Sequence, residues 1–168
     1  LSSHAEPARK REILKDSHAG AFAMIFLAVY FIAAVALCAE LPRTRTAVLA
    51  LGIQQVLARA VGALASVWFP GSTQTGLLAA FRDAAARRSA VVLALWIAAC
   101  AAALIALSPA GGIAAVLAAG LCMWYVYRMS RREFGGMSGD LAGFLITISG
   151  AAMLLAQIAA ERVSAIWF

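Results

Sequence analysis

The chain has 168 residues, of which 64% are hydrophobic and only 13% are charged, and its mean hydropathy is +0.88. A water-soluble domain of this length usually contains about 25% charged residues, so the composition excludes an ordinary soluble domain and favours a protein that spans a lipid bilayer. The net charge of +6 is better explained by basic residues that flank membrane spans than by nucleic-acid binding, which we do not expect.

Apolar segments long enough to cross a bilayer recur along the chain. About 20 apolar residues form one helical crossing, and a helix satisfies its own backbone hydrogen bonds in lipid. Residues 89–127 hold no charge and are too long for one span, but Ser108-Pro109-Ala110-Gly111-Gly112 divides them. The sequence therefore predicts an all-α fold, a polytopic membrane bundle of about five transmembrane helices with residues 1–168 as a single domain. The expected spans are 20–40, 46–69, 89–108, 111–127 and 141–160.

Basic residues are distributed unequally between the segments that connect these spans. Segments 1–19, 70–88 and 128–140 share one side of the membrane and contain ten Lys and Arg residues, whereas the opposite side contains three. Because positively charged segments are retained in the cytoplasm, the three segments are expected to be cytoplasmic.

A first polar cluster, Lys15-Asp16-Ser17-His18-Ala19-Gly20, precedes the first span. Asp16 is either a surface carboxylate beside Lys15 or a functional group that binds a metal or acts as a base. His18 titrates near neutral pH, so it is able to orient a phosphate or transfer a proton, although an interfacial role explains it as well. A second polar cluster occupies residues 76–83.

The third polar cluster, residues 135–143, enters the last span and places four glycines around Asp140. Glycine permits unusual backbone angles, and the N–H groups of a helix N-terminus favour phosphate. A carboxylate at that position suits Mg²⁺, a hard cation. These parts predict a site for phosphate and metal. The alternative is a flexible loop in which Asp140 caps the helix and Gly139 and Gly143 form a helix-packing pair.

Arg59 lies near the middle of the second span. A charged side chain there costs about 2.5–3.5 kcal/mol on insertion scales and usually faces the interior of a bundle. Gln55 is a plausible neighbour one turn earlier. We expect Arg59 to face an internal polar cavity and to neutralise a phosphate or a buried carboxylate; the alternative is a structural hydrogen-bonding role.

In this order, the clusters resemble the motifs of the adenosylcobinamide-GDP ribazoletransferase (cobalamin synthase) family of bacteria and archaea. The first cluster is similar to the family pattern K/R-D-S/P-x-x-G, and Gly135 to Gly143 are similar to G-G-x-T/S-G-D-x-x-G. Arg59 matches an arginine within a helix of small residues, and the Gly76-Leu77 pair precedes a matching Phe81. The resemblance covers almost the whole chain, and its last motif is the most specific.

Two departures and one omission accompany the resemblance. Ser138 replaces a frequent threonine and keeps the hydroxyl, and Phe144 replaces a small residue. Family members carry an Asp-rich D-G-x-x-D-type motif upstream of a stretch like Leu1-Ser2-Ser3-His4, where this chain begins. We therefore expect an N-terminally truncated member that holds only part of the active site and need not be active alone.

The resemblance implies a Mg²⁺-dependent phosphotransferase that joins α-ribazole, or α-ribazole 5′-phosphate, to adenosylcobinamide-GDP and releases GMP, completing adenosylcobalamin. It places the protein in the bacterial cytoplasmic (inner) membrane, in the lipid bilayer, with the polar motifs facing the cytoplasm. Whether copies form a homo-oligomer stays open. The residues implied in catalysis and in holding Mg²⁺ are Asp16 and Asp140. Those implied in binding substrate and phosphate are Lys15, Ser17, His18, Arg59, Gly135, Gly136, Ser138 and Gly139.

Two other functions are compatible with parts of the sequence. A CDP-alcohol phosphotransferase also works at a membrane with aspartate and Mg²⁺, but its run of Asp, Gly and Ala-Arg in one helical region is not found. A transport subunit or a purely structural bundle would tolerate replacement of the cytoplasmic aspartates.

Overall fold

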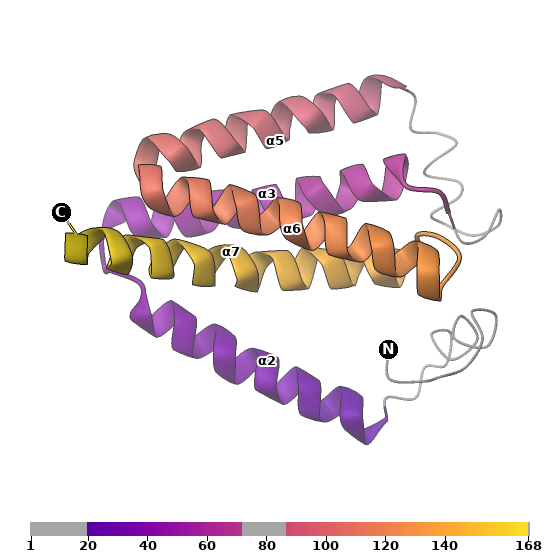
Figure 1. The fold of residues 1–168 in the computed structure, drawn as a ribbon, viewed down its shortest axis with the longest axis horizontal. Coiled ribbons are helices and arrows are strands. Elements are labelled where there is room, and N and C mark those ends of the chain that lie inside the picture. Colours follow the sequence, from indigo (N-terminus) through magenta and orange to yellow (C-terminus); the bar gives the residue numbers. More distant parts are fainter. Residues whose placement is uncertain (1–19, 72–86, 168) are drawn as a thin grey trace.

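The computed structural model describes residues 20–71 and 87–167, and within these ranges the regular structure is helical (Figure 1). The helices are α2 (Ala21–Glu40), α3 (Arg45–Trp68), α5 (Arg87–Leu107), α6 (Pro109–Glu133) and α7 (Gly139–Trp167). The candidate membrane spans, judged by length and hydropathy, number five among the described residues. This confirms the predicted all-α bundle of about five helices able to cross a membrane.

The last two helices are longer than the spans expected from hydropathy. Helix α6 continues to Glu133 instead of residue 127, and α7 runs from Gly139 to Trp167 instead of from 141 to 160. The expected loop 128–140 was therefore too long, since only residues 134–138 separate the two helices. Arginine is a good helix former, and Arg131 donates a hydrogen bond from Nη1 to Tyr127 Oη at 2.9 Å, one turn earlier.

Helices α3, α6 and α7 surround the core, and α5 packs against α3 and α6 (Figure 1). Gly111, Ala115 and Ala119 form a stripe of small residues along α6, and all three are buried. A Cβ atom at Gly111 would lie 2.8 Å from Gln157 Cγ, and one at Gly112 would overlap the backbone of Leu104. Small residues therefore let α6 approach both α7 and the end of α5 closely.

Polar groups join the core helices at the end where α7 finishes. Gln54 is fully buried and donates from Nε2 to Gln157 Oε1, and Gln157 donates from Nε2 to Glu161 Oε1 at 2.9 Å. A buried amide costs less in an apolar interior when it is hydrogen-bonded, and Gln54 achieves this through Nε2, while its Oε1 has no partner among the described residues. This series ties α3 to α7 within the membrane-spanning part of the bundle.

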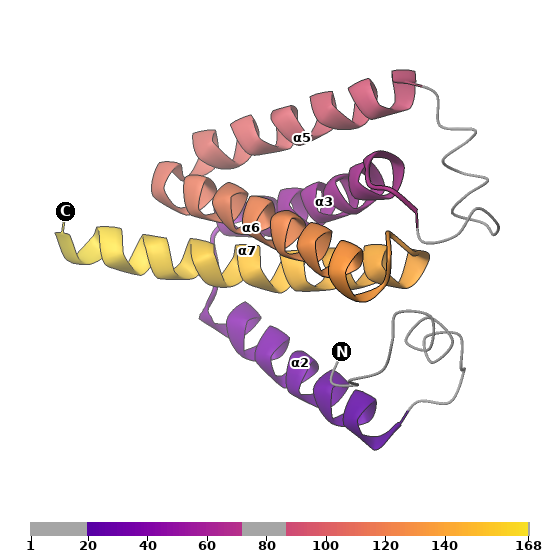
Figure 2. The same ribbon diagram turned by 45° about the vertical axis from the view of Figure 1, so that its right-hand side comes forward.

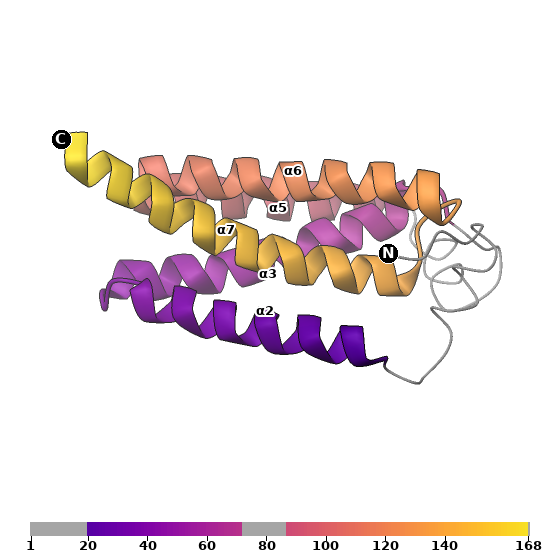
Figure 3. The ribbon, with the colours of Figure 1, turned by 60° about the horizontal axis from the view of Figure 1, so that its bottom comes forward.

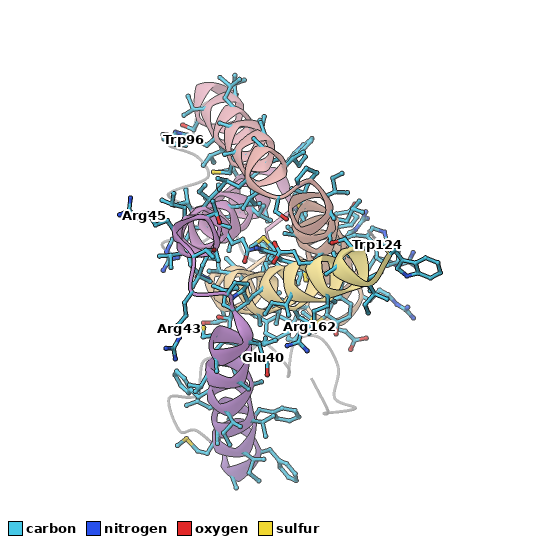
Figure 4. The ribbon with its side chains drawn as sticks, turned by 90° about the vertical axis from the view of Figure 1, so that its left-hand side faces the viewer. Glu40, Arg43, Arg45, Trp96, Trp124 and Arg162 are labelled. Atoms are coloured by element: carbon cyan, nitrogen blue, oxygen red, sulfur yellow. The ribbon has the colours of Figure 1, made fainter. Side chains whose placement is uncertain are left out.

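Helix α2 is the peripheral element. It lies on the side of α3 and α7 away from α5 and α6 (Figures 3 and 4), and it contains no buried residue. Its carboxyl end is fastened by the ion pair between Arg162 Nη2 and Glu40 Oε2, which Figure 4 shows pointing toward each other. Figures 1 and 2 show α2 diverging from α7 toward the opposite end.

The helix ends that adjoin the three polar clusters in the sequence lie at one end of the bundle. Helix α2 begins, α3 ends, α5 begins, α6 ends and α7 begins at one end of the bundle, the right-hand end of Figure 1. The three polar clusters adjoin these helix ends in the sequence. The α6–α7 loop at this end holds the residues that we describe next.

Candidate functional site

The loop between α6 and α7 is shaped by two adjacent glycines. Gly135 has a φ of 69° and Gly136 a φ of 146°, values that residues with a side chain rarely adopt. The chain can therefore turn sharply after the buried Phe134, and the N–H of Gly136 reaches back to Ser130 O at 2.9 Å. The sequence prediction that these glycines serve an unusual backbone conformation is confirmed.

The loop is anchored to the end of α3. The N–H of Met137 donates to Pro70 O at 2.7 Å, and the Met137 side chain is only 1% exposed. Next to this contact, the buried Phe69 ring packs against Tyr127 of α6, with 4.8 Å between the ring centroids. Residues 70 and 71, which follow α3, thus lie against the α6–α7 loop. The second polar cluster, residues 76–83, falls outside the described residues.

Ser138, and not Asp140, caps helix α7. Ser138 Oγ accepts a hydrogen bond from the N–H of Leu141 at 3.3 Å, which is the usual geometry of a serine N-cap. Asp140 lies in the first turn and is exposed, and no hydrogen bond or ion pair occupies its carboxylate within the described part of the chain. The alternative in which Asp140 caps the helix is therefore wrong, because Ser138 makes that contact.

Gly139 and Gly143 do not form a packing pair in this structure. A Cβ atom at either position would meet no atom within 4 Å among the described residues, and both glycines are exposed. One turn further along α7, Thr147 is also exposed and donates from Oγ1 to Gly143 O at 3.0 Å. The glycines instead leave the surface beside Asp140 unobstructed.

Arg59 does not face an internal cavity, contrary to what we expected from the sequence. It is the fifteenth of the 24 residues of α3, as expected, but its side chain is exposed on the outer surface and does not point into an internal cavity. The buried side chains of α3 lie on the opposite face of the helix, because alanines and leucines at those positions pack better than a cation. Arg59 Nη1 donates to Gln55 O at 3.0 Å, which confirms Gln55 as its neighbour.

The residues of the first cluster lie outside the described residues, so the roles of Lys15, Asp16, Ser17 and His18 stay predictions. Gly20, which ends this cluster, occupies the N-cap position of α2. Within the described ranges, no three His, Cys, Asp or Glu side chains gather closely enough to hold a metal ion together. Asp140 is thus a single carboxylate in the part of the site that is described.

The structure also shows a basic and aromatic surface that the sequence reading missed. A hollow of about 440 Å³ on α6 is lined by Trp124, Tyr125, Arg128, Met129, Arg132 and Glu133. The Arg128 guanidinium lies over the Trp124 ring at 5.4 Å from its centroid. Trp124 and Arg128 are four residues apart, which places them on the same face of a helix. The sequence did not predict this contact, because residues from 128 onward were expected to form a loop.

Comparison with known proteins agrees with the resemblance found in the motifs. The family model described as "Cobalamin-5-phosphate synthase" matches residues 1–158. The chain is 31% identical over 162 residues to a protein of Lachnoclostridium phytofermentans named "Adenosylcobinamide-GDP ribazoletransferase", a match that covers 94% of this chain. The chain spans only 61% of the length of that relative. No solved structure matches the chain. Because the family model accounts for more than half of its residues, the chain belongs to the cobalamin-5-phosphate synthase family.

Proposed function

We propose that this protein transfers α-ribazole, or its 5′-phosphate, to adenosylcobinamide-GDP and releases GMP, which is the final assembly step of adenosylcobalamin. Membership of the cobalamin-5-phosphate synthase family and the name of the relative from Lachnoclostridium phytofermentans support this proposal. The family does not favour the CDP-alcohol phosphotransferase or the non-catalytic bundle that the sequence also allowed. For GMP to leave, a hydroxyl of the ribazole attacks the phosphorus nearer to cobinamide, and the bond between the two phosphates breaks.

The observation that carries the proposal is that Ser138, rather than Asp140, caps helix α7. Because the hydroxyl of Ser138 caps α7, the carboxylate of Asp140 stands exposed in the first helical turn. The N-terminus of a helix attracts a phosphate, but a carboxylate beside it repels one. A cation between the carboxylate and the phosphate resolves this conflict, which is why the arrangement suits a diphosphate bound together with a metal.

The donor set available to a metal fits Mg²⁺. This ion keeps several waters and is commonly held by one or two carboxylates together with phosphate oxygens of the substrate. Asp140 would supply one carboxylate, and Asp16 would supply the second from the segment before α2. When bound, Mg²⁺ would neutralise charge on the diphosphate and on the departing GMP.

The remaining residues would hold and orient the substrates. Ser138 accepts a hydrogen bond from Leu141 N–H, so its own hydroxyl proton is left to donate to a phosphate oxygen. Gly135 and Gly139 are exposed and would let the diphosphate approach the backbone, since they carry no side chain. Gly136 is buried and its N–H donates to Ser130 O, so it would shape the loop instead. Lys15 would add positive charge, Ser17 a hydroxyl donor, and His18 a group able to take the proton of the attacking hydroxyl. Arg59 lies on the outer surface of α3 near mid-span.

The same proposal places the protein in the bacterial inner membrane with the loop end in the cytoplasm. The basic residues concentrated in the segments at that end support this orientation. Substrates that carry a nucleotide are water-soluble, and a site at the cytoplasmic surface is accessible to them.

The test is release of GMP by the complete protein in liposomes supplied with adenosylcobinamide-GDP, α-ribazole 5′-phosphate and Mg²⁺. We expect release that stops when the metal is removed by EDTA and resumes when Mg²⁺ is returned. Parallel reactions with unphosphorylated α-ribazole show which acceptor is preferred. A well-folded protein that releases no GMP with either acceptor would rule the transferase out.

A further inference from the structure

The outer face of α3 and α7 is unlike a surface made only for lipid. Arg59 and Gln55 on α3, and Gly143 and Thr147 on α7, are all exposed there. The two sets lie close together, because a Cβ atom at Gly150 of α7 would lie 3.5 Å from Gln55 Nε2. The guanidinium of Arg59, the amide of Gln55 and the hydroxyl of Thr147 thus lie at the depth of the membrane interior. The neighbouring surface of α7 projects little, because Gly143 has no side chain. Polar groups at this depth normally face protein or water rather than lipid.

Arg59 is only partly satisfied in the arrangement observed. Among the described residues, the guanidinium donates one hydrogen bond, to the carbonyl of Gln55 within its own helix. A guanidinium carries five N–H donors. Lipid tails offer no acceptor for the others, so a partner that covers this face and supplies an oxygen would be favoured.

Helix α2 presents a matching face. Among its residues only Tyr30, Ala34 and Leu37 are partly covered, and all the others are exposed. These three residues are spaced as i, i+4 and i+7, so they form one stripe that is turned toward α3 and α7. The stripe continues to Ala23 by the same spacing, but α2 has by then diverged from α7 (Figure 1). Helix α2 therefore contacts the other helices near Glu40 and is separated from them toward its first residues.

The register of the two helices places Tyr30 at the polar part of this face. Tyr30 lies ten residues before the end of α2, and Gln55 lies ten residues after the start of α3. At 1.5 Å per residue, both are about 15 Å from the connection between the helices. Tyr30 is also the only residue with an oxygen-bearing side chain between Ala21 and Ala39. Its hydroxyl is able to accept from Arg59 and to donate to Gln55 Oε1.

We propose that the outer face of α3 and α7 is a docking surface for α2, which closes along it from the Glu40 end until the Tyr30 hydroxyl meets the side chains of Arg59 and Gln55. The existing contact at Leu37 and the ion pair of Glu40 with Arg162 fix the pivot. Gly143 lets the two helices approach closely, because a side chain of α2 meets no Cβ there.

Closure has a geometric result for the loop end of the bundle. The start of α2 and the start of α7 lie at the same end, so closing the helix brings Gly20 toward Gly139 and Asp140. This consequence deepens the proposed function, but the docking of α2 does not depend on it.

Disulfide formation in membranes tests the docking without substrates, so its outcome is separate from that of the GMP assay. The three free cysteines, Cys38, Cys100 and Cys122, are first replaced by alanine. Ala23→Cys is then combined with Gly143→Cys, and the matched control combines Ile25→Cys, on the opposite face of α2, with the same Gly143→Cys. Mild oxidation should join the first pair within one chain, shown by loss of maleimide labelling in the monomer band, and leave the control pair reduced.

Tyr30→Phe, introduced into the Ala23 and Gly143 cysteine pair, separates the hydroxyl contact from simple helix packing. It removes one oxygen and should lower the rate of crosslinking about threefold, the effect of an average interhelical hydrogen bond in a membrane protein. An unchanged rate would remove Tyr30 from the proposal. Equal crosslinking of both pairs, or a reduced pair whose cysteines stay open to maleimide, would refute docking. Crosslinks found only in a dimer band would identify a second copy as the occupant and refute docking of α2 as well.

Discussion

The N–H of Met137 donates a hydrogen bond to the carbonyl of Pro70 at 2.7 Å, so the loop that begins α7 is fastened to the residues that end α3. Asp140 follows three residues later in the sequence. The position of its carboxylate therefore depends on two helices that are distant in the chain, and variants in this loop should reveal whether that position matters for transfer.

Asp140→Asn should lower the rate of GMP release by about 100-fold or more, the scale of losing one electrostatic contact to a transition state. It keeps the shape of the side chain, and the cap supplied by Ser138 remains, so thermal stability should change little. The control is Arg45→Gln, which neutralises an exposed charge at the opposite end of the bundle and should keep near-normal turnover. Full activity of the Asp140→Asn protein would exclude a role in holding metal.

Gly136→Ala should destabilise the protein and impair transfer, because a φ of 146° strains any residue with a side chain. Gly135→Ala, at a φ of 69°, should cost less, about 1–2 kcal/mol. Gly120→Ala is the control, since that glycine is helical and nothing lies within 4 Å of an added Cβ. Unfolding of the purified protein in detergent measures all three variants. If Gly136→Ala unfolds no earlier than Gly120→Ala, the loop is not held in this conformation.

Gly112→Ala should be clearly more destabilising than Gly62→Ala. An added Cβ at Gly112 would overlap the backbone of Leu104, which cannot move without shifting α5. At Gly62 the nearest atoms belong instead to a side chain, Ile146 Cγ1 at 2.5 Å and Cδ1 at 2.9 Å, which can shift without moving the backbone of a neighbouring helix. We expect a loss of about 1–3 kcal/mol at Gly112, the usual range for overpacking. The reverse order in thermal unfolding would contradict the close approach of α5 and α6.

Gln54→Leu should cost about 1–3 kcal/mol, because it leaves Gln157 Oε1 without its buried donor. Combining it with Gln157→Leu should cost less than the sum of the two single changes, since the apolar pair leaves no unmet group between these positions. A double-mutant cycle of unfolding free energies measures this coupling. Strict additivity would mean that the two amides do not interact in the bilayer.

Membrane orientation can be tested with two exposed arginines from opposite ends of the bundle. In the cysteine-free background, Arg132→Cys should react with an impermeant maleimide only in inverted inner-membrane vesicles, and Arg43→Cys only from the periplasmic side. Both positions are exposed. Because positive charge resists translocation, the end that contains Arg132 is expected in the cytoplasm. Labelling with the opposite sidedness would overturn the orientation.

Hydropathy was sufficient to predict the helices of this protein, because the need to satisfy backbone groups in lipid leaves few alternatives to a helix. It was insufficient at the ends of α6 and α7, where charged residues such as Arg131 continue the helix beyond the apolar segment. The four-residue spacing of Gly111, Ala115 and Ala119 places all three on one face of α6, where the structure shows them buried.

The candidate site was only partly accessible from the sequence. The glycine-rich approach to α7 was visible as a local pattern, but the choice between Ser138 and Asp140 as the cap depends on backbone geometry that either residue allows. The contact of Met137 with Pro70 joins residues far apart in the chain, and no local pattern indicates it. Arg59 was misplaced because mid-span charges usually face inward, whereas here the inward face is already filled by close-packed apolar residues.

The corner between α5 and α6 has a consequence for how the chain enters a membrane. Residues 89–127 contain no charged side chain, so the whole helical hairpin crosses without moving a charge through lipid. The polar groups at the corner are matched locally: Ser108 Oγ accepts from Gly111 N–H at 3.3 Å, and Gly112 N–H donates to Ser108 O at 2.6 Å. These bonds need no other helix. Helices α5 and α6 can thus insert as a preassembled pair during synthesis, before the ribosome has produced α7, against which α6 packs.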